Sequence, residues 1–417
     1  MARYETTWFF IAFLFFLFCA PFYERSRNRK AAAAFLLILP SYFLGLIVFG
    51  WGRQMLQVHS RIDGTLAYPG VVSEGSPYVG LMQDQTPTFF AFMRFMINQG
   101  DGSLALYGHV VDWINALSLA AIVVCFAAAI LIVRRDARFS PVSVASLASL
   151  CIAGMLPLVR NIEVGNANIW VAAFVALHLL AVRISRDKTT DFLGGAALGV
   201  AFMIKPYLFL VLVFLFFSSL RKREFAVVLG VIAAGACGFG CSLLVPGIGL
   251  DTYRQFIFEV SRTVYFHGAY HEGLSDINLS LLKYVPTHMV GGVSALITGT
   301  FGVLAFIASK KGKCSETPWY FITLFPYPIM WEQHLMGIFP AFFFLFLEKE
   351  KLEQVVLCAM VATLMFFSCV IMTPLIPNIL LFGLWLWNVW LSSSPQISRE
   401  MIPLRKESGD RKNAIEG

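Results

Sequence analysis

Long apolar segments, separated by short polar stretches, run along almost the whole of this 417-residue chain. A helix crosses a hydrocarbon core of about 30 Å with roughly 20 apolar residues, and with fewer where helices are buried among others. The pattern predicts about thirteen helical segments, several of them too short to span alone and therefore broken or partly buried. They are 7–22, 32–50, 106–133, 141–158, 168–182, 192–204, 207–220, 225–245, 289–309, 318–331, 335–347, 352–372 and 374–391.

Two longer polar regions interrupt this pattern, at 51–105 and 246–288. Each contains an amphipathic stretch, one around Phe89–Ile97 and one from Tyr253 to Val264, where apolar residues recur at helical spacing. Both stretches are too short to cross a bilayer, and they predict helices that lie in the interface plane. The alternative is that they merely cap the bundle, and this is compatible with their also bordering a site for a lipid substrate.

Composition supports a multi-pass membrane protein. Hydrophobic residues make up 58% of the chain and charged residues 14%, whereas a soluble domain has roughly 25% charged residues. The predicted fold class is therefore an all-α polytopic membrane protein. We expect one membrane domain over 1–392, with 51–105 and 246–288 as its large extracytoplasmic loops, and a disordered cytoplasmic tail at 393–417.

The net charge of +7 reflects topology better than nucleic-acid binding, because the basic residues form short clusters between apolar segments. If the segments alternate in direction, six clusters and the tail place 23 of the 32 Lys and Arg residues on one side. By the positive-inside rule this side is cytoplasmic, the N-terminus lies outside, and both large loops are extracytoplasmic. The protein is then expected in the plasma (inner) membrane.

Asp63, in the first extracytoplasmic loop, is the acid that we single out as a candidate for catalysis. Further polar groups fall at the same predicted boundary. Lys205 lies between two short apolar segments, where it either meets an anionic headgroup or snorkels to the interface. Asn168 opens an apolar segment, as a helix cap or as a ligand contact. The remaining candidates are Arg160, Asn278, Glu332 and His334.

We expect no metal and no cofactor. His267 and His271 have a spacing that suits a metal on a helix, but Gly268 and Gly273 disfavour a helix there. The chain has no D-x-D motif.

Several motifs, in order along the chain, resemble glycosyltransferase family 87, whose members are polytopic enzymes of the GT-C type. The central block has Gly165 and Asn168 opening a helix, a glycine-rich segment, Lys205-Pro206-Tyr207, and Arg221-Lys222-Arg223. The first loop supplies Asp63, Tyr68, Gly75, Pro77 and Tyr78, then Thr86-Pro87-x-Phe89. Asn278-Leu279-Ser280-Leu281-Leu282 and Pro328-Ile329-Met330-Trp331-Glu332-Gln333-His334 complete the series. The resemblance extends from about Ala32 to Ala341, with departures at Asn166, Gln333 and Thr86-Pro87-Thr88.

The resemblance implies a GT-C bundle of about 11–13 transmembrane helices that moves a sugar, typically mannose, from a polyprenyl-phosphate donor. Transfer would occur with inversion, outside the cytoplasm, to an acceptor hydroxyl that the sequence does not identify. Asp63 would be the general base. Lys205, His334 and Arg160 would stabilise the departing phosphate, and Glu332, Asn168 and Asn278 would contribute to substrate binding.

Two other functions fit a chain of this kind. A transporter or flippase of lipid-linked sugars would also need a boundary cation, but would require ionisable residues deep in its spans, where only His109, Asp112 and His178 are available. An inactive structural subunit would tolerate changes at Asp63 and Lys205.

Overall fold

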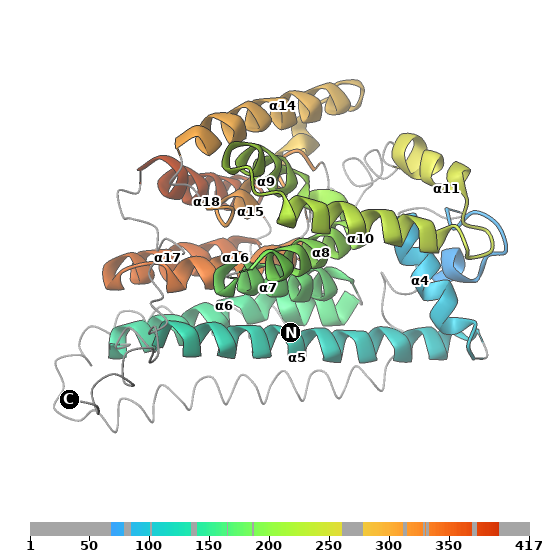
Figure 1. Ribbon diagram of the computed structural model, residues 1–417, viewed down its shortest axis with the longest axis horizontal. Helices are drawn as coiled ribbons and strands as arrows, with labels where there is room; N and C mark the ends of the chain where they lie inside the picture. Colours follow the sequence, from blue (N-terminus) through green and yellow to red (C-terminus); the bar gives the residue numbers. More distant parts are fainter. Residues whose placement is uncertain are drawn as a thin grey trace, which may run out of the picture.

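A computed structural model describes residues 68–78, 85–100, 102–134, 140–164, 166–185, 187–260, 278–311, 315–327, 330, 333–368 and 373–391. In these residues every regular element is a helix (Figure 1). The α-helices are α4 (Pro87–Ile97), α5 (Leu104–Arg134), α6 (Pro141–Val164), α7 (Asn168–Ile184), α8 (Lys188–Ile204), α9 (Phe209–Lys222), α10 (Ala226–Ser242), α11 (Leu250–Gln255), α14 (Thr287–Lys311), α15 (Trp319–Ile322), α16 (His334–Leu347), α17 (Lys351–Phe366) and α18 (Leu375–Leu386). Short 3-10 helices are η2 (Pro206–Leu208) and η4 (Leu281–Tyr284), and π-helices are η3 (Phe256–Val260) and η6 (Trp387–Leu391).

Most predicted segments agree with these helices. The predicted break between 192–204 and 207–220 is confirmed, because α8 ends at Ile204 and η2 precedes α9. The predicted helix over 318–331 is wrong, since α15 covers only Trp319–Ile322. Pro326 and Pro328 follow it, and each removes a backbone donor and restricts the residue before it. Segments 7–22 and 32–50 lie outside the described residues.

Two of the described helical stretches, Leu104–Ile132 and Thr287–Lys310, have the length and apolar composition needed to cross a membrane. Several shorter apolar helices accompany them, including α7, α10 and α16. The predicted total of 11–13 spans stays a prediction.

The bundle is organised around α7. This helix packs against α5, α8 and α16, while α6 contacts α16 and α17, and α14 contacts α9. Figure 1 shows α5, α6, α7 and α16 running side by side along the length of the molecule, with α4 and α11 at one end. The core is apolar and contains many phenylalanine rings, such as Phe126 stacked on Phe343 with centroids 3.6 Å apart.

Glycines let α8 and α10 approach each other closely. A Cβ added to Gly195 would lie 2.0 Å from the carbonyl oxygen of Val227, and one added to Gly230 would lie 2.0 Å from that of Phe192. Backbone contact of this kind is typical of small-residue interfaces in membranes. It fixes the position of α8, and with it the position of the helix end that carries Lys205.

The end of the bundle that carries α4 and α11, here called the loop end, is tied together by Arg94. Its guanidinium donates to the carbonyl oxygens of Gly70 (2.9 Å), Val71 (3.1 Å), Gly75 (2.8 Å) and Pro246 (2.8 Å), and to Ser73 Oγ (2.8 Å). The side chain is buried, so these bonds replace the water that the charge has lost. The two long polar regions are therefore joined at this end.

Gly247, the residue after Pro246, is also constrained by Arg94. Its φ of +77° favours glycine, and a Cβ there would lie 2.4 Å from Arg94 Nη1. The stretches predicted to be amphipathic are helical in α4, α11 and η3. Phe89, Phe90 and Met93 of α4 are buried against the bundle, while Phe95 is 57% exposed, so α4 caps the bundle and also presents an apolar edge.

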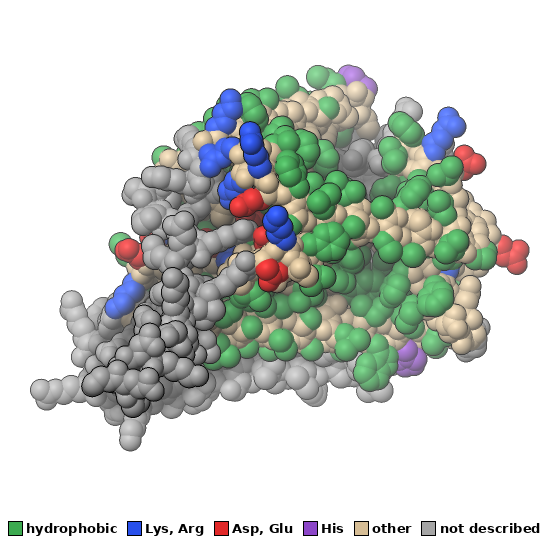
Figure 2. Space-filling model, in the orientation of Figure 1, with side chains coloured by type: hydrophobic (Ala, Val, Ile, Leu, Met, Phe, Trp, Pro, Cys, Tyr) green, Lys and Arg blue, Asp and Glu red, His purple; other side chains and the backbone are tan. Residues whose placement is uncertain are grey.

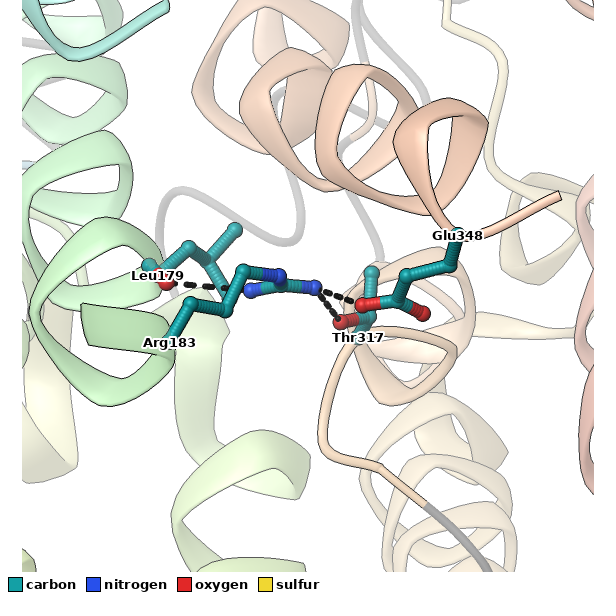
Figure 3. Close-up of polar contacts among 4 residues, drawn as sticks. All are labelled: Leu179, Arg183, Thr317 and Glu348. Carbon is teal, nitrogen blue, oxygen red and sulfur yellow. Dashed lines mark hydrogen bonds and ion pairs between the residues drawn. The ribbon is translucent and has the colours of Figure 1, made fainter. Parts of the chain in front are cut away.

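At the opposite end, Arg183 of α7 connects three elements (Figure 3). It donates to the Leu179 carbonyl (3.0 Å) and Thr317 Oγ1 (3.0 Å), and it forms an ion pair with Glu348 just after α16. Burial raises the pKa of Glu348, and the Arg183 charge opposes that rise. Arg221 donates to the Lys310 carbonyl at this same end, here called the basic end (2.7 Å).

Basic side chains are distributed unevenly between the basic end and the loop end. Figure 2 shows most of the visible Lys and Arg side chains toward the basic end, with fewer at the loop end and a largely apolar surface between them. Two of the six basic clusters, Arg221–Arg223 and the one formed by Lys310, Lys311 and Lys313, are connected there by the bond from Arg221 to the Lys310 carbonyl. This grouping agrees with the alternating direction assumed for the segments, and which end faces the cytoplasm remains a prediction.

The close contact between α8 and α10 can be tested with Gly195→Val. The added side chain would meet the Val227 backbone, so we expect the free energy of unfolding to fall by about 2 kcal/mol or more. Unfolding of the detergent-solubilised protein by denaturant measures this change. The matched control is Gly235→Val in α10, where a Cβ meets nothing within 4 Å. Equal losses in the two variants would contradict the proposed contact.

Candidate functional site

Lys205 lies at the break between α8 and η2, and its side chain has no exposed surface. The helix stops there because Pro206 cannot continue the hydrogen-bonding ladder and disfavours helical geometry at the preceding residue. Lys205 takes an extended backbone conformation, and its N–H donates to the Ala201 carbonyl (3.0 Å). A buried ammonium group requires polar surroundings, so the residues around this break are the first candidates for a functional site.

Tyr207, two residues further on, joins several of these residues. Its hydroxyl donates to Asn168 Oδ1 (3.1 Å), and its ring lies edge-on to His334, with centroids 5.6 Å apart. The Tyr207 carbonyl accepts a hydrogen bond from Thr323 Oγ1, and its ring is 6.3 Å from that of Tyr327. Three predicted site residues, Lys205, Asn168 and His334, thus converge on one turn of chain.

Two helices begin beside Tyr207. Asn168 is the first residue of α7, and His334 is the first residue of α16. Helix N-termini carry partial positive charge and unpaired N–H groups, which favour an anion. Both helix starts lie beside the turn of chain that follows the buried Lys205, here called the α8 break.

A glycine lets α16 come this close. A Cβ added at Gly337, one turn after His334, would lie 1.8 Å from the Tyr207 hydroxyl oxygen. Only a residue without a side chain fits against that hydroxyl, so Gly337 sets the distance between α16 and the α8 break.

Asn168 acts mainly as part of the α7 N-terminus. Its N–H (3.2 Å) and its Nδ2 (2.7 Å) both donate to Asn166 Oδ1, and its own Oδ1 accepts from Tyr207. Asn168 itself does not cap α7, whose N-cap is Ala167 without a side-chain capping bond, and it is Asn166 Oδ1 that accepts from the N–H of this first helical residue. The role of Asn168 in substrate binding stays a prediction, and the structure gives its amide protein partners on both sides.

Asn278 holds the backbone beside the same site. Its Oδ1 accepts from the N–H groups of Ser280 and Met330, both at 3.0 Å. Ser280 Oγ in turn donates to the Tyr327 carbonyl (2.9 Å), and the Tyr327 ring lies 6.1 Å from that of His334. Asn278 therefore links the second polar region to the chain that leads into α16.

The start of α16 is also fixed from α6. Asn161 Nδ2 donates to the carbonyl oxygens of Pro157 (2.8 Å) and Gln333 (2.9 Å), and the Asn161 carbonyl accepts from the Asn166 N–H (3.1 Å). A single buried asparagine thus contacts the chain just before α7 and just before α16. It sets the relative position of the two helix N-termini.

Helix α4 covers the first turn of α7. Phe89 stacks on Trp170 with centroids 5.5 Å apart, and Trp170 Nε1 donates to Asn115 Oδ1 of α5 (2.7 Å). Thr86 Oγ1 caps α4 and donates to the Met203 carbonyl near the end of α8. The site is therefore enclosed by aromatic and amide side chains from α4, α5 and α7.

The remaining predicted residues are not placed by the structure. Asp63 and Glu332 lie outside the described residues. Arg160 belongs to α6, and its side chain is outside the described part. Their roles stay predictions.

Sequence reasoning missed three contributors to the site. Asn115 and Trp170 occur within apolar segments typical of membrane helices, and Tyr327 lies within 318–331, which was expected to be helical. Asn161 follows the predicted segment 141–158, next to Arg160, and its partners could not be read from the sequence. An asparagine inside an apolar helix is itself a signal, since an amide buried there needs a partner. Which partner it finds depends on tertiary structure.

Comparison with known proteins gives one match. The model of glycosyltransferase family 87 matches residues 105–321, which is more than half of the chain. No curated protein and no solved structure matches significantly. The matched region contains the start of α7, the α8 break and Asn278, and it ends before α16.

A double-mutant cycle tests the packing of Tyr207 on Gly337. Gly337→Ala places a methyl group against the hydroxyl, so we expect it to lower the free energy of unfolding by about 1–3 kcal/mol. Tyr207→Phe removes the obstructing oxygen, so the cost of Gly337→Ala should fall clearly when both changes are combined. Gly383→Ala in α18, where the nearest atom is 3.8 Å away, is the matched control. Strict additivity of the two changes would argue against the contact.

Proposed function

The chain belongs to glycosyltransferase family 87, and we propose that it transfers mannose from a polyprenyl-phosphate donor to an acceptor hydroxyl on the extracytoplasmic side, with inversion. Family membership makes it a glycosyltransferase, and its long apolar helices agree with a membrane protein. The donor, the sugar and the sidedness are parts of the proposal. The phosphate donor is supported by one observation, which is that Tyr207 contacts the starts of α7 and α16 next to the buried Lys205. The sugar rests on the resemblance to the family, and the sidedness rests on the distribution of the basic residues.

This arrangement suits a leaving phosphate. Negative charge grows on the phosphate oxygen as the bond to the sugar's anomeric carbon breaks. A buried cation and two helix N-termini stabilise that charge more effectively than they would in water, because few solvent molecules screen them. In the proposal Lys205 and His334 contact the phosphate, and Arg160 adds a further charge.

The attacking oxygen needs a base. In the proposal Asp63 removes the proton from the acceptor hydroxyl while that oxygen attacks the anomeric carbon from the face opposite the phosphate. The polyprenyl phosphate departs and the configuration inverts. The step balances without a metal, since the proton goes to the carboxylate and the electron pair of the broken bond goes to the phosphate.

The lipid chain of the proposed donor explains why the site lies in an apolar helical bundle. A polyprenyl tail lies in the hydrocarbon region while its phosphate sits at the boundary, so the site must lie near one end of the bundle. The loop end is the end opposite the Arg183 and Arg221 contacts, and the positive-inside rule assigns it to the extracytoplasmic side.

Turnover in detergent separates a transferase from a transporter. The purified protein, incubated with polyprenyl-phosphate mannose and crude membrane acceptors, should yield mannosylated product that mass analysis detects. A transporter needs two compartments and gives no product in detergent. Absence of product with every sugar in a panel of polyprenyl-phosphate donors would exclude the transferase proposal.

The role of Asp63 as base is tested by Asp63→Asn. Because general-base catalysis contributes about 10²- to 10⁴-fold, we expect turnover to fall by at least 100-fold while the donor still binds. Glu74 and Asp84 are lower-ranked candidates for the base, and the same assay ranks them. Glu74→Gln, at an exposed position of the same region, serves as the comparison and should keep near-normal turnover. Near-normal turnover of Asp63→Asn would remove Asp63 from this role.

Replacing the residue that binds the phosphate should impair donor binding, whereas replacing the base should impair turnover only. Lys205→Met should weaken donor binding by about 30-fold or more, because the phosphate would lose its buried cationic partner. The equilibrium dissociation constants of polyprenyl phosphate for Lys205→Met and for Asp63→Asn distinguish the two roles. Unchanged binding in Lys205→Met would contradict a contact with phosphate.

A further inference from the structure

Two buried amides beside the start of α7 each have one polar atom that no described residue contacts through a hydrogen bond. Asn115 Nδ2 and Asn161 Oδ1 are shielded from solvent and have no hydrogen-bond partner within the described part of the chain. Asn115 is 2% exposed and Asn161 is fully buried. Leaving such a group unsatisfied costs roughly 1–3 kcal/mol, so each calls for an explanation.

The chemistry of each atom is fixed by its neighbours. The Trp170 indole N–H can only donate, so the atom of Asn115 that faces it is the carbonyl oxygen, and the other atom is a donor. Asn161 meets two carbonyl oxygens, which can only accept, so its amide nitrogen faces them and the remaining atom is an acceptor. The two amides thus leave one donor and one acceptor without a partner in the described part of the chain.

The two amides flank one turn of chain. Asn161 contacts Asn166 just before α7, and Asn115 contacts Trp170 in the first turn of α7. In the sequence Asn168 lies between Asn166 and Trp170, and it accepts a hydrogen bond from the Tyr207 hydroxyl. Both amides therefore contact the chain next to the residue that Tyr207 binds.

This combination excludes phosphate as the ligand of both atoms. Phosphate oxygens at neutral pH act mainly as acceptors, and they cannot satisfy Asn161 Oδ1. A sugar hydroxyl donates and accepts at once, so neighbouring hydroxyls of one ring can satisfy both amides. The Trp170 ring, stacked on Phe89, lies next to the Asn115 amide, and aromatic side chains commonly accompany polar contacts in ligand sites.

We propose that Asn115 and Asn161 form the sugar-recognition part of the donor site, with Asn115 Nδ2 donating to one hydroxyl of the transferred sugar and Asn161 Oδ1 accepting from another. This inference rests on the proposed function and deepens it, since it assigns residues to the sugar as well as to the phosphate. An ordered water has the same hydrogen-bonding chemistry and is the alternative occupant.

The experiment compares two ligands that differ only in the sugar. The dissociation constants of polyprenyl-phosphate mannose and of polyprenyl phosphate are measured on the full-length protein in detergent. In the wild type the mannosyl ligand should bind at least tenfold more tightly, and Asn115→Leu and Asn161→Leu should each reduce that ratio by about tenfold. Damage to the fold affects both ligands alike and leaves the ratio unchanged.

Asn388→Leu is the matched control, because Asn388 is also a buried asparagine but donates to the Leu384 carbonyl in another part of the bundle. It should keep the wild-type ratio. A second measurement needs no protein variant. The dissociation constants of the wild type are measured for mannosyl ligands that each lack one sugar hydroxyl, and removal of at least one hydroxyl should weaken binding about tenfold.

The outcomes separate this inference from the proposed function. A wild-type ratio near one, unchanged ratios in both leucine variants, or no effect of any hydroxyl deletion would overturn the inference and leave water as the occupant. A high ratio that falls in the variants, in a protein that forms no product, would support the sugar site while rejecting the transfer reaction.

Discussion

The burial of Lys205 at the break between α8 and η2 is the constraint on which the surrounding structure depends. A charge with no exposed surface is tolerated only among polar groups, and an apolar helical bundle has few to offer. The starts of α7 and α16 converge beside this break, where Tyr207 contacts both. Their N-termini carry positive partial charge and so add to the charge of the ammonium, and in the proposed function the donor phosphate balances this positive charge.

Close packing by glycine makes this convergence possible. Gly195 and Gly230 set α8 against α10, and Gly337 admits the Tyr207 hydroxyl against α16. On the outer side, Arg94 joins the two polar regions over the loop end, so the region that follows Asp63 in sequence is fixed to α4 and to Pro246. A few contacts between distant parts of the chain therefore position the site.

The sequence predicted well those features that depend on local covalent chemistry. Pro206 makes a helix break at Lys205 necessary, and the apolar periodicity located α5, α10 and α14. It failed at 318–331, where mean apolarity concealed the effect of Pro326 on the helix. The central position of Tyr207 and the partners of Asn115 and Asn161 could not be predicted, because they depend on which distant helices become neighbours. Asn278 was expected to contribute to substrate binding, and in the structure its side-chain oxygen holds two backbone N–H groups.

Photo-crosslinking tests the central claim most directly. A polyprenyl phosphate that carries a photoreactive group next to its phosphate is bound to the purified protein and irradiated, and the labelled peptides are identified by mass. The account predicts labels in residues 205–208 and 333–337, with competition by unlabelled polyprenyl phosphate. Specific labelling at the basic end, near Arg183 or Arg221, with none around Tyr207, would contradict it.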